Sequence, residues 1–152
     1  MTTPARVGGR VTDRGEQPER HTELRLPHAS TAGAEARREV GRRLRSLLSL
    51  ERLADATLLT DELVTNAIRH ARPEPDGSVG LRIEVARDCV RIAVTDGSPR
   101  FEWATRAAPD LAGGFGLILV DRVSDRWGLS LDGKKAVWFE IDLPAGARRS
   151  VG

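Results

Sequence analysis

The spacing of apolar residues along the chain predicts a layered α+β domain. Alternation with a period of two marks strands, and apolar residues that recur every three or four positions mark helices. The pattern predicts, in chain order, a strand at 21–26, helices at about 34–50 and 53–71, strands at 79–86 and 90–95, a helix at 116–123, and strands at 127–131 and 136–143. This order is typical of a two-layer sandwich, in which a mixed, mostly antiparallel sheet carries helices on one face.

Turn and capping residues set the ends of these elements. Ser30 or Thr31 offers an N-cap to the first helix. The proline-containing loop at 72–77 ends the second helix. The pairs Arg87–Asp88 and Asp132–Gly133 predict hairpin turns. These signals agree with the strand and helix order given above.

The two ends of the chain have little apolar periodicity. We expect residues 1–20 to be disordered, residues 21–144 to form one domain and residues 145–152 to be a tail. The chain shows neither a secretory signal nor an apolar run long enough to span a bilayer, and Cys89 is its only cysteine. Because a lone cysteine cannot form an intramolecular disulfide, we expect a soluble, cytoplasmic protein with Cys89 packed in a strand.

The charge balance argues against nucleic acid as the main partner. The net charge is only +2, because 24 basic residues are offset by 22 acidic ones. Arg38, Arg42 and Arg45 recur on one face of the first predicted helix. This face is either solvated surface or a docking patch for a partner.

The second predicted helix carries a carboxylate and an amide at the border of its apolar stripe. At about 100° per residue, Asn66 falls about 40° from Glu62 on the helix wheel, so the two side chains stack one turn apart. A charge at the edge of a core is unfavourable unless it is paired or coordinated. The pattern therefore predicts either a ligand site or a structural role, in which Glu62 pairs with Arg69 or Arg122 and Asn66 hydrogen-bonds a loop.

Two further patches contain groups that suit a nucleotide. Asp96 follows an apolar strand and precedes Gly97, which predicts either a turn or a fixed acceptor for the exocyclic amine of adenine. The segment Gly113–Gly116 opens a predicted helix. There, glycines allow backbone amides to approach a phosphate, and the helix start adds N–H donors. Each patch alone is a weak signal.

In this order, the three patches resemble the N, G1 and G2 boxes of the histidine-kinase-like ATPase superfamily, which includes gyrase and the sensor histidine kinases. Residues 62–70 (ELVTNAIRH) are most similar to the small single-domain anti-sigma factor serine kinases and their regulatory relatives. The resemblance covers residues 21–143, including the DRWG segment at 125–128 and the KAVWFEI segment at 135–141. It implies a Bergerat-type ATP-binding fold that uses ATP and Mg²⁺.

The resemblance also implies a role for each matching residue. Glu62 would be the general base, Asn66 would bind Mg²⁺, and Asp96 would accept a hydrogen bond from adenine. Arg69 stands where sensor kinases often carry a phosphate-facing lysine, which implies a charge stabiliser. The other implied cofactor-binding residues are Ser98 beside adenine and Gly113, Gly114, Phe115, Gly116 and Leu117 along the phosphates. Residues 99–112 would form a mobile lid.

Three residues depart from the family pattern. Ser98 stands where the G1 box usually has glycine, Phe115 stands where close relatives commonly have a basic residue, and Ala136 replaces a frequent threonine that helps to hold adenine. None of these changes removes the metal, base or adenine groups. Each could lower nucleotide affinity or the rate of phosphotransfer.

Two functions therefore follow from the resemblance. The first is an anti-sigma factor with serine/threonine kinase activity toward an anti-anti-sigma partner. The second is an ATP-binding switch that acts by partner binding alone. The nucleotide-binding half of a sensor histidine kinase fits less well, because no helical hairpin with a phosphoacceptor histidine precedes the domain. The implied partners are a sigma factor, an anti-anti-sigma factor and a second copy in a homodimer, without direct contact with nucleic acid or membrane.

Overall fold

The computed structural model describes residues 20–70, 72–97, 115–130 and 136–145. The elements within these ranges are β1 (Arg20–Pro27), α1 (Ala32–Leu44), α2 (Leu50–His70), β2 (Ser78–Val85), β3 (Cys89–Thr95), α4 (Phe115–Val123), β4 (Arg126–Ser130) and β5 (Ala136–Asp142). This order confirms the predicted α+β class. The segments 1–19, 98–114, 131–135 and 146–152, which include the predicted lid and the Asp132–Gly133 turn, lie outside the described residues.

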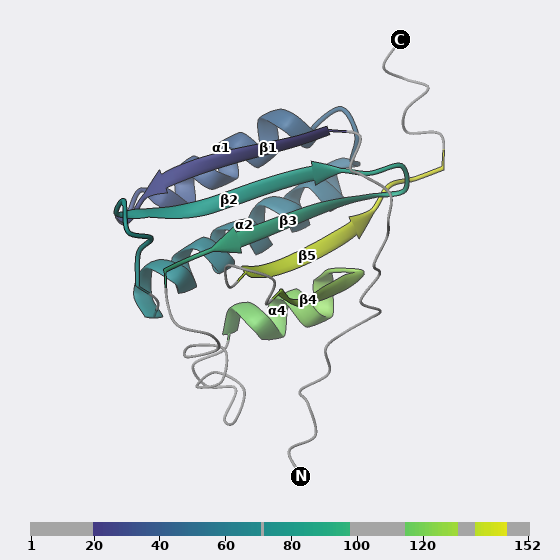
Figure 1. The fold of residues 1–152 in the computed structure, drawn as a ribbon. Coiled ribbons are helices and arrows are strands. Elements are labelled where there is room, and N and C mark those ends of the chain that lie inside the picture. Colours follow the sequence, from purple (N-terminus) through teal and green to yellow (C-terminus); the bar gives the residue numbers. More distant parts are fainter. Residues whose placement is uncertain (1–19, 71, 98–114, 131–135, 146–152) are drawn as a thin grey trace.

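The strands form one sheet in the order β1-β2-β3-β5-β4, and each pairing among them is antiparallel (Figure 1). The last strand, β5, lies between β3 and β4. A row of apolar residues crosses the sheet, because Ile92 of β3 pairs with Ile83 of β2 on one side and with Phe139 of β5 on the other. Helices α1 and α2 lie along one face of the sheet, and α4 packs against α2 and β4 (Figure 1).

One core fills the space between the helices and the sheet. Along β3 the inward side chains Val90, Ile92 and Val94 are buried, whereas Arg91 and Ala93 between them are half-buried on the opposite face. The core residues that α2 contributes are Ala56, Leu59, Leu63, Val64 and Ala67. The apolar stripe that the helix wheel predicted for α2 is thus its buried side.

The turn between α1 and α2 comes earlier than the sequence pattern predicted. Helix α1 ends at Leu44 rather than near residue 50. The chain then makes a turn in which Leu47 and Leu48 both donate backbone N–H groups to the Leu44 carbonyl, at 2.9 and 3.1 Å. Ser49 then caps α2, since its hydroxyl oxygen accepts the Arg52 N–H at 3.2 Å. Leu48 is buried in this turn, so it extends the apolar stripe past the true helix end.

The remaining boundaries agree with the prediction to within about two residues. Thr31 occupies the N-cap position of α1, but its side chain makes no capping hydrogen bond. Cys89 begins β3 and its thiol is buried, as expected for a packed strand residue.

Candidate functional site

Helix α2 carries Glu62 and Asn66 at the edge of the core. Asn66 is only 8% exposed, and Glu62 one turn before it is half-buried. Their neighbours Leu63 and Ala67 are buried in the core. The sequence therefore placed both polar side chains correctly, at the border between the buried stripe and the surface.

The amide of Asn66 has no hydrogen-bond partner in the part of the chain that the structure describes. Its Nδ2 atom is fully buried and unsatisfied. An unsatisfied buried donor costs about 1–3 kcal/mol, and such groups are rare in native proteins. A ligand with oxygen acceptors would remove that cost, and the amide carbonyl is an oxygen ligand that suits Mg²⁺. Asn66 thus fits a magnesium-chelated phosphate.

The carboxylate of Glu62 is half-buried and forms no ion pair with the residues that the structure describes. Among the described residues it forms neither a hydrogen bond nor an ion pair, so the pairing with Arg69 or Arg122 that the sequence left open is absent. Arg69 and Arg122 are both exposed. Glu62 is therefore available to act on a substrate.

Asp96 lies directly after β3 and is 4% exposed. The backbone holds this strand end against the segment that follows α2, because the Gly97 N–H donates to the Arg72 carbonyl at 2.8 Å. Two patches that are distant in the sequence, at the end of α2 and at the end of β3, are thereby joined. A buried carboxylate held at such a point is a directional acceptor, as recognition of an adenine amine requires.

Gly97 is a residue whose importance the sequence did not reveal. A Cβ atom at this position would lie 2.0 Å from the carbonyl oxygen of Pro73 and 2.7 Å from its carbonyl carbon. The close approach of two backbones explains why this chain has its glycine at 97, directly after Asp96, rather than at 98. From the sequence, this region showed only that Ser98 stands where the G1 box usually has glycine.

The third patch lies partly within the described residues. Helix α4 begins at Phe115, so the predicted glycine-rich segment does open a helix. Phe115, Gly116 and Leu117 form its first turn, where N–H groups without an intrahelical partner can bind an anion. Ser98, Gly113 and Gly114 lie outside the described residues.

The basic face of α1 is exposed, as the sequence pattern indicated. Arg38, Arg42 and Arg45 are exposed, and Arg42 pairs with Glu39 at 2.9 Å. Hydrogen bonds from Arg42, which are the largest influence, and the charges of Arg42 and Arg43 lower the pKa of Glu39 below its usual value of 4.5. Whether this face binds a partner stays a prediction.

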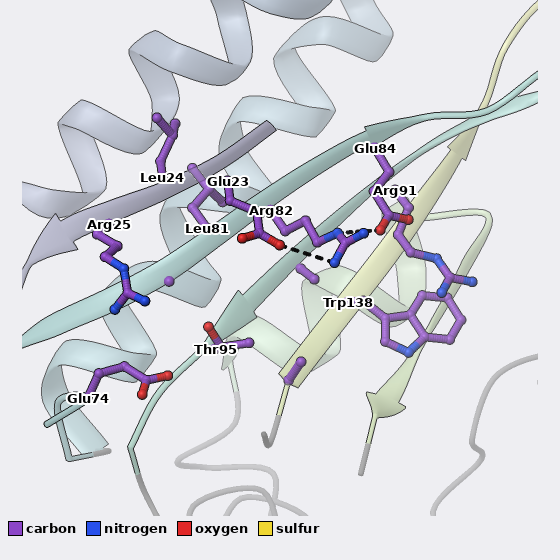
Figure 2. A pocket seen from close by; sticks show the side chains of 13 residues that line it. Glu23, Leu24, Arg25, Glu74, Leu81, Arg82, Glu84, Arg91, Thr95 and Trp138 are labelled. Atoms are coloured by element: carbon purple, nitrogen blue, oxygen red, sulfur yellow. Dashed lines mark hydrogen bonds and ion pairs between the residues drawn. The ribbon is translucent and has the colours of Figure 1, made fainter. Parts of the chain in front are cut away.

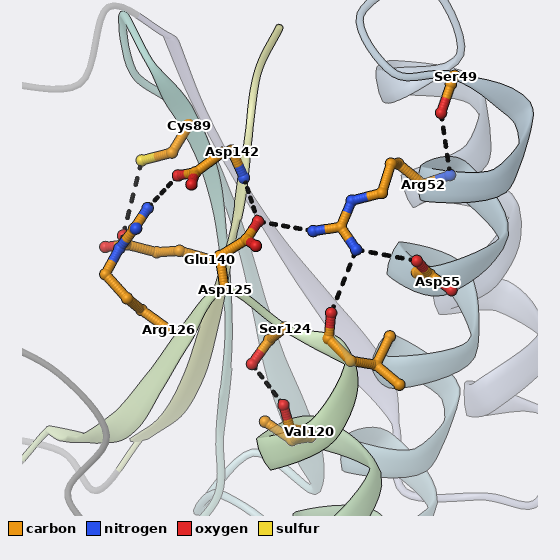
Figure 3. Close-up of polar contacts among 11 residues, drawn as sticks. Ser49, Arg52, Asp55, Cys89, Val120, Ser124, Asp125, Arg126, Glu140 and Asp142 are labelled. Atoms are coloured by element: carbon orange, nitrogen blue, oxygen red, sulfur yellow. Dashed lines mark hydrogen bonds and ion pairs between the residues drawn. The ribbon is translucent and has the colours of Figure 1, made fainter.

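A charge cluster that the sequence did not predict lies on the face of the sheet opposite α1 and α2 (Figure 3). Glu140 of β5 is 2% exposed, and its carboxylate accepts hydrogen bonds from Arg91 at 2.5 Å and Arg126 at 2.7 Å. Burial raises the pKa of Glu140, but the hydrogen bonds and charges of the two arginines outweigh it, so the pKa lies below 4.5. Hydrogen bonds to Asp142 and Glu140 in turn raise the pKa of Arg126.

A hollow of about 720 Å³ also lies on this face of the sheet, opposite α1 and α2 (Figure 2). The residues that line it include the small Gly80, Ala93 and Ala136. Its walls include Arg82 and Trp138, and the guanidinium of Arg91 stacks at 4.2 Å from the Trp138 ring centre. The lining residues include neither Glu62, Asn66 nor Asp96, so this hollow is separate from the candidate site on the helix-covered side.

The fold and the family match of the sequence together define an ATP-binding α+β domain. The sequence profile of the histidine kinase-like ATPase domain matches residues 25–140, and the chain therefore belongs to that family. A comparison with curated proteins finds no match. Within the described ranges, none of the helices combines the length and the apolar character needed to cross a bilayer.

Proposed function

We propose that this protein is an anti-sigma factor that transfers the γ-phosphoryl group of ATP to a serine or threonine of an anti-anti-sigma partner in the cytoplasm. Membership of the histidine kinase-like ATPase family supports ATP binding and ATP-dependent phosphotransfer in general. The observation that carries the proposal is the pair on α2: a buried Asn66 amide, one turn from the Glu62 carboxylate, with neither group bonded to another side chain among the described residues. The specific acceptor and the sigma factor come from the resemblance of residues 62–70.

The nucleotide would be held at three points by this chain. Asp96 would accept a hydrogen bond from adenine, and Asn66 would bind Mg²⁺. The first turn of α4 would donate backbone N–H groups to phosphate oxygens. When bound, Mg²⁺ neutralises charge that develops on the transferred phosphoryl group.

Glu62 would act as the general base. The acceptor hydroxyl oxygen forms a bond to the γ-phosphorus, its proton passes to the Glu62 carboxylate, and the bond from the γ-phosphorus to the bridging oxygen breaks to release ADP. In such reactions positioning and charge neutralisation supply most of the rate. The half-buried Glu62 is not engaged by a cation in the described residues, which leaves its carboxylate free to accept the proton.

Incubation with γ-labelled ATP, Mg²⁺ and a purified anti-anti-sigma protein tests the proposal. We expect label on a serine or threonine of the partner with the wild-type protein, and its loss with Glu62→Ala. Glu51→Ala is a matched control, because Glu51 is exposed in the first turn of the same helix. Label transfer by Glu62→Ala at the wild-type rate would contradict the assigned base.

A second candidate is an ATP-binding switch without phosphotransfer, in which the nucleotide changes affinity for a partner. The observation that favours it is Phe115, which begins α4 where close relatives commonly have a basic residue. The same experiment separates the two functions. Tight binding of Mg·ATP without label transfer identifies the switch, and failure to bind Mg·ATP rejects both.

A further inference from the structure

Arg52, in the first turn of α2, connects this helix to the end of α4 (Figure 3). Its guanidinium donates to the backbone carbonyl of Val123 at 3.2 Å and to Asp125 Oδ2 at 2.6 Å. It also donates to Asp55 Oδ2, in its own helix, at 3.0 Å. Three acceptors from two separate segments therefore share one guanidinium, which we call the Arg52 clamp.

The clamp is anchored in the sheet. Asp125 Oδ2, which accepts from Arg52, also accepts the backbone N–H of Asp142 at 2.7 Å, and the Asp125 N–H donates to the Glu140 carbonyl at 3.0 Å. Asp142 and Glu140 belong to β5. The clamp therefore ties α2 and the end of α4 to a strand inside the sheet.

Arginine suits this position for physical reasons. Val123 is the last residue of α4, whose terminal carbonyls lack intrahelical donors and carry the negative end of the helix dipole. A guanidinium stays charged and presents donors in a fixed fork, so it can bond the carbonyl and the carboxylate at once. The Arg52 side chain is 30% exposed, and solvent thus screens the ion pairs only in part.

The clamp and the candidate nucleotide site occupy opposite ends of the same helix pair. The clamp joins the start of α2 to the end of α4. Asn66 lies about 21 Å further along α2, and the anion-binding turn of α4 begins at Phe115, the other end of a helix about 13 Å long. A tilt of α4 by about 4° around its clamped end would displace its first turn by about 1 Å.

We propose that Arg52 is a positioning residue, which sets the distance between Asn66 and the first turn of α4. This inference rests on the proposed function, because it requires that the phosphates of Mg·ATP engage both elements. A misplacement of about 1 Å can lower the rate of a catalysed reaction about 100-fold. Adenosine lacks phosphates and contacts only the region of Asp96, so its binding does not depend on the clamp.

The test compares two ligands in Arg52→Gln. We expect the affinity for a non-hydrolysable Mg·ATP analogue, measured by calorimetry, to fall about tenfold. The affinity for adenosine, measured by NMR titration, should stay within about twofold of wild type. Arg52→Lys keeps the positive charge, but all of its N–H donors lie on one nitrogen instead of a planar fork. This variant should therefore recover only part of the affinity that Arg52→Gln loses.

Arg82→Gln is the matched control. Arg82 is a half-buried arginine that also forms ion pairs with two carboxylates, Glu23 at 3.2 Å and Glu84 at 2.5 Å, but on the face of the sheet opposite α1 and α2. Arg82→Gln should leave the affinities for the Mg·ATP analogue and for adenosine unchanged. Asp125→Asn is a second variant, because it keeps an oxygen acceptor for the Asp142 N–H and weakens only the charged bond to Arg52. Asp125→Asn should also lose affinity for the Mg·ATP analogue but not for adenosine, and the loss should be smaller than in Arg52→Gln.

The outcomes separate the inference from the proposed function. If the wild-type protein does not bind the Mg·ATP analogue, the proposed function fails. If it binds and folded Arg52→Gln binds equally well, the clamp does not position the site. Equal losses for the analogue and for adenosine, in both Arg52→Gln and Asp125→Asn, would show that the clamp only stabilises the fold and would also overturn the inference.

Discussion

Asn66 is a polar side chain whose burial has no explanation within the described structure. It lies in a helix flanked by core residues, and its Nδ2 atom has no acceptor there. Asparagine is also a poorer helix former than alanine. Selection for stability alone would favour an apolar residue at this position. A buried amide that lowers stability is best explained by binding, since functional sites are often less stable than they could be.

Asn66→Ala should separate function from stability. We expect this variant to lose measurable binding of Mg·ATP in a calorimetric titration. Its free energy of unfolding should stay within about 1 kcal/mol of wild type, because no hydrogen bond to a described residue is lost and alanine favours the helix. Thr57→Ala is the control on the same helix and should keep the binding of Mg·ATP. The Thr57 hydroxyl donates a hydrogen bond to the Leu53 carbonyl. Wild-type affinity in Asn66→Ala would contradict the metal-site assignment.

At the level of elements, the site depends on how the end of β3 meets the segment after α2. The Gly97 N–H bonds the Arg72 carbonyl, and Gly97 lies directly on the backbone of Pro73. This contact fixes where Asp96 emerges from the sheet relative to the helix with Glu62 and Asn66. The glycine is therefore required for close approach of two backbones, not for a special φ angle.

Gly97→Ala should destabilise the protein by about 1–3 kcal/mol, as overpacking does, because a Cβ would meet the Pro73 carbonyl at 2.0 Å. Denaturant unfolding measures this change. Gly41→Ala is the control, since the nearest atom to a Cβ there, Thr57 Cγ2, lies 3.9 Å away. Because Gly41 lies in the interior of α1, Gly41→Ala should raise the free energy of unfolding by about 0.5–1 kcal/mol. Equal effects of the two substitutions would contradict the close-approach explanation.

The whole molecule has two different sheet faces. The helix-covered face holds the apolar core and, at its edge, the candidate nucleotide site. The other face carries charged side chains that bond each other across strands, with Glu140 joining β5 to Arg91 of β3 and Arg126 of β4. These bonds hold three strands together on the face that no described helix covers. They should therefore contribute to global stability in a pH-dependent way.

Glu140→Gln tests that contribution. The pKa of Glu140 is lowered in the folded protein, so the stabilisation is present above about pH 4.5 and is lost as the pH falls through the lower folded value. We expect a loss of about 1.5–3 kcal/mol at pH 7 that shrinks toward acid pH, measured by urea unfolding from about pH 3 to pH 7.

Asp142→Asn serves as the control for this titration. Asp142 also pairs with Arg126, but its side chain is 54% exposed, so an effect below about 1 kcal/mol is expected. A pH profile of Glu140→Gln that parallels the wild type over the whole range would show that Glu140 does not contribute to the acid sensitivity.

The amino-acid sequence determined the element types, their order and the residues of the candidate site. Helical and strand periodicities arise from local backbone geometry, so Glu62 and Asn66 could be placed on one side of a helix and Asp96 at a strand end. Local signals were weakest where an apolar stripe continued through a turn. For that reason the end of α1 was predicted too late, with the buried Leu48 assigned to the helix.

The tertiary structure alone decided which distant residues meet. The insertion of β5 between β3 and β4 brings Glu140 to Arg91, and the approach of β3 to the segment after α2 places Gly97 on Pro73. The Arg52 clamp likewise joins the start of α2 to the end of α4. Pairing across such separations depends on how complete faces pack together, which no local pattern records. For this reason the sequence could suggest candidate site residues but not the contacts that position them.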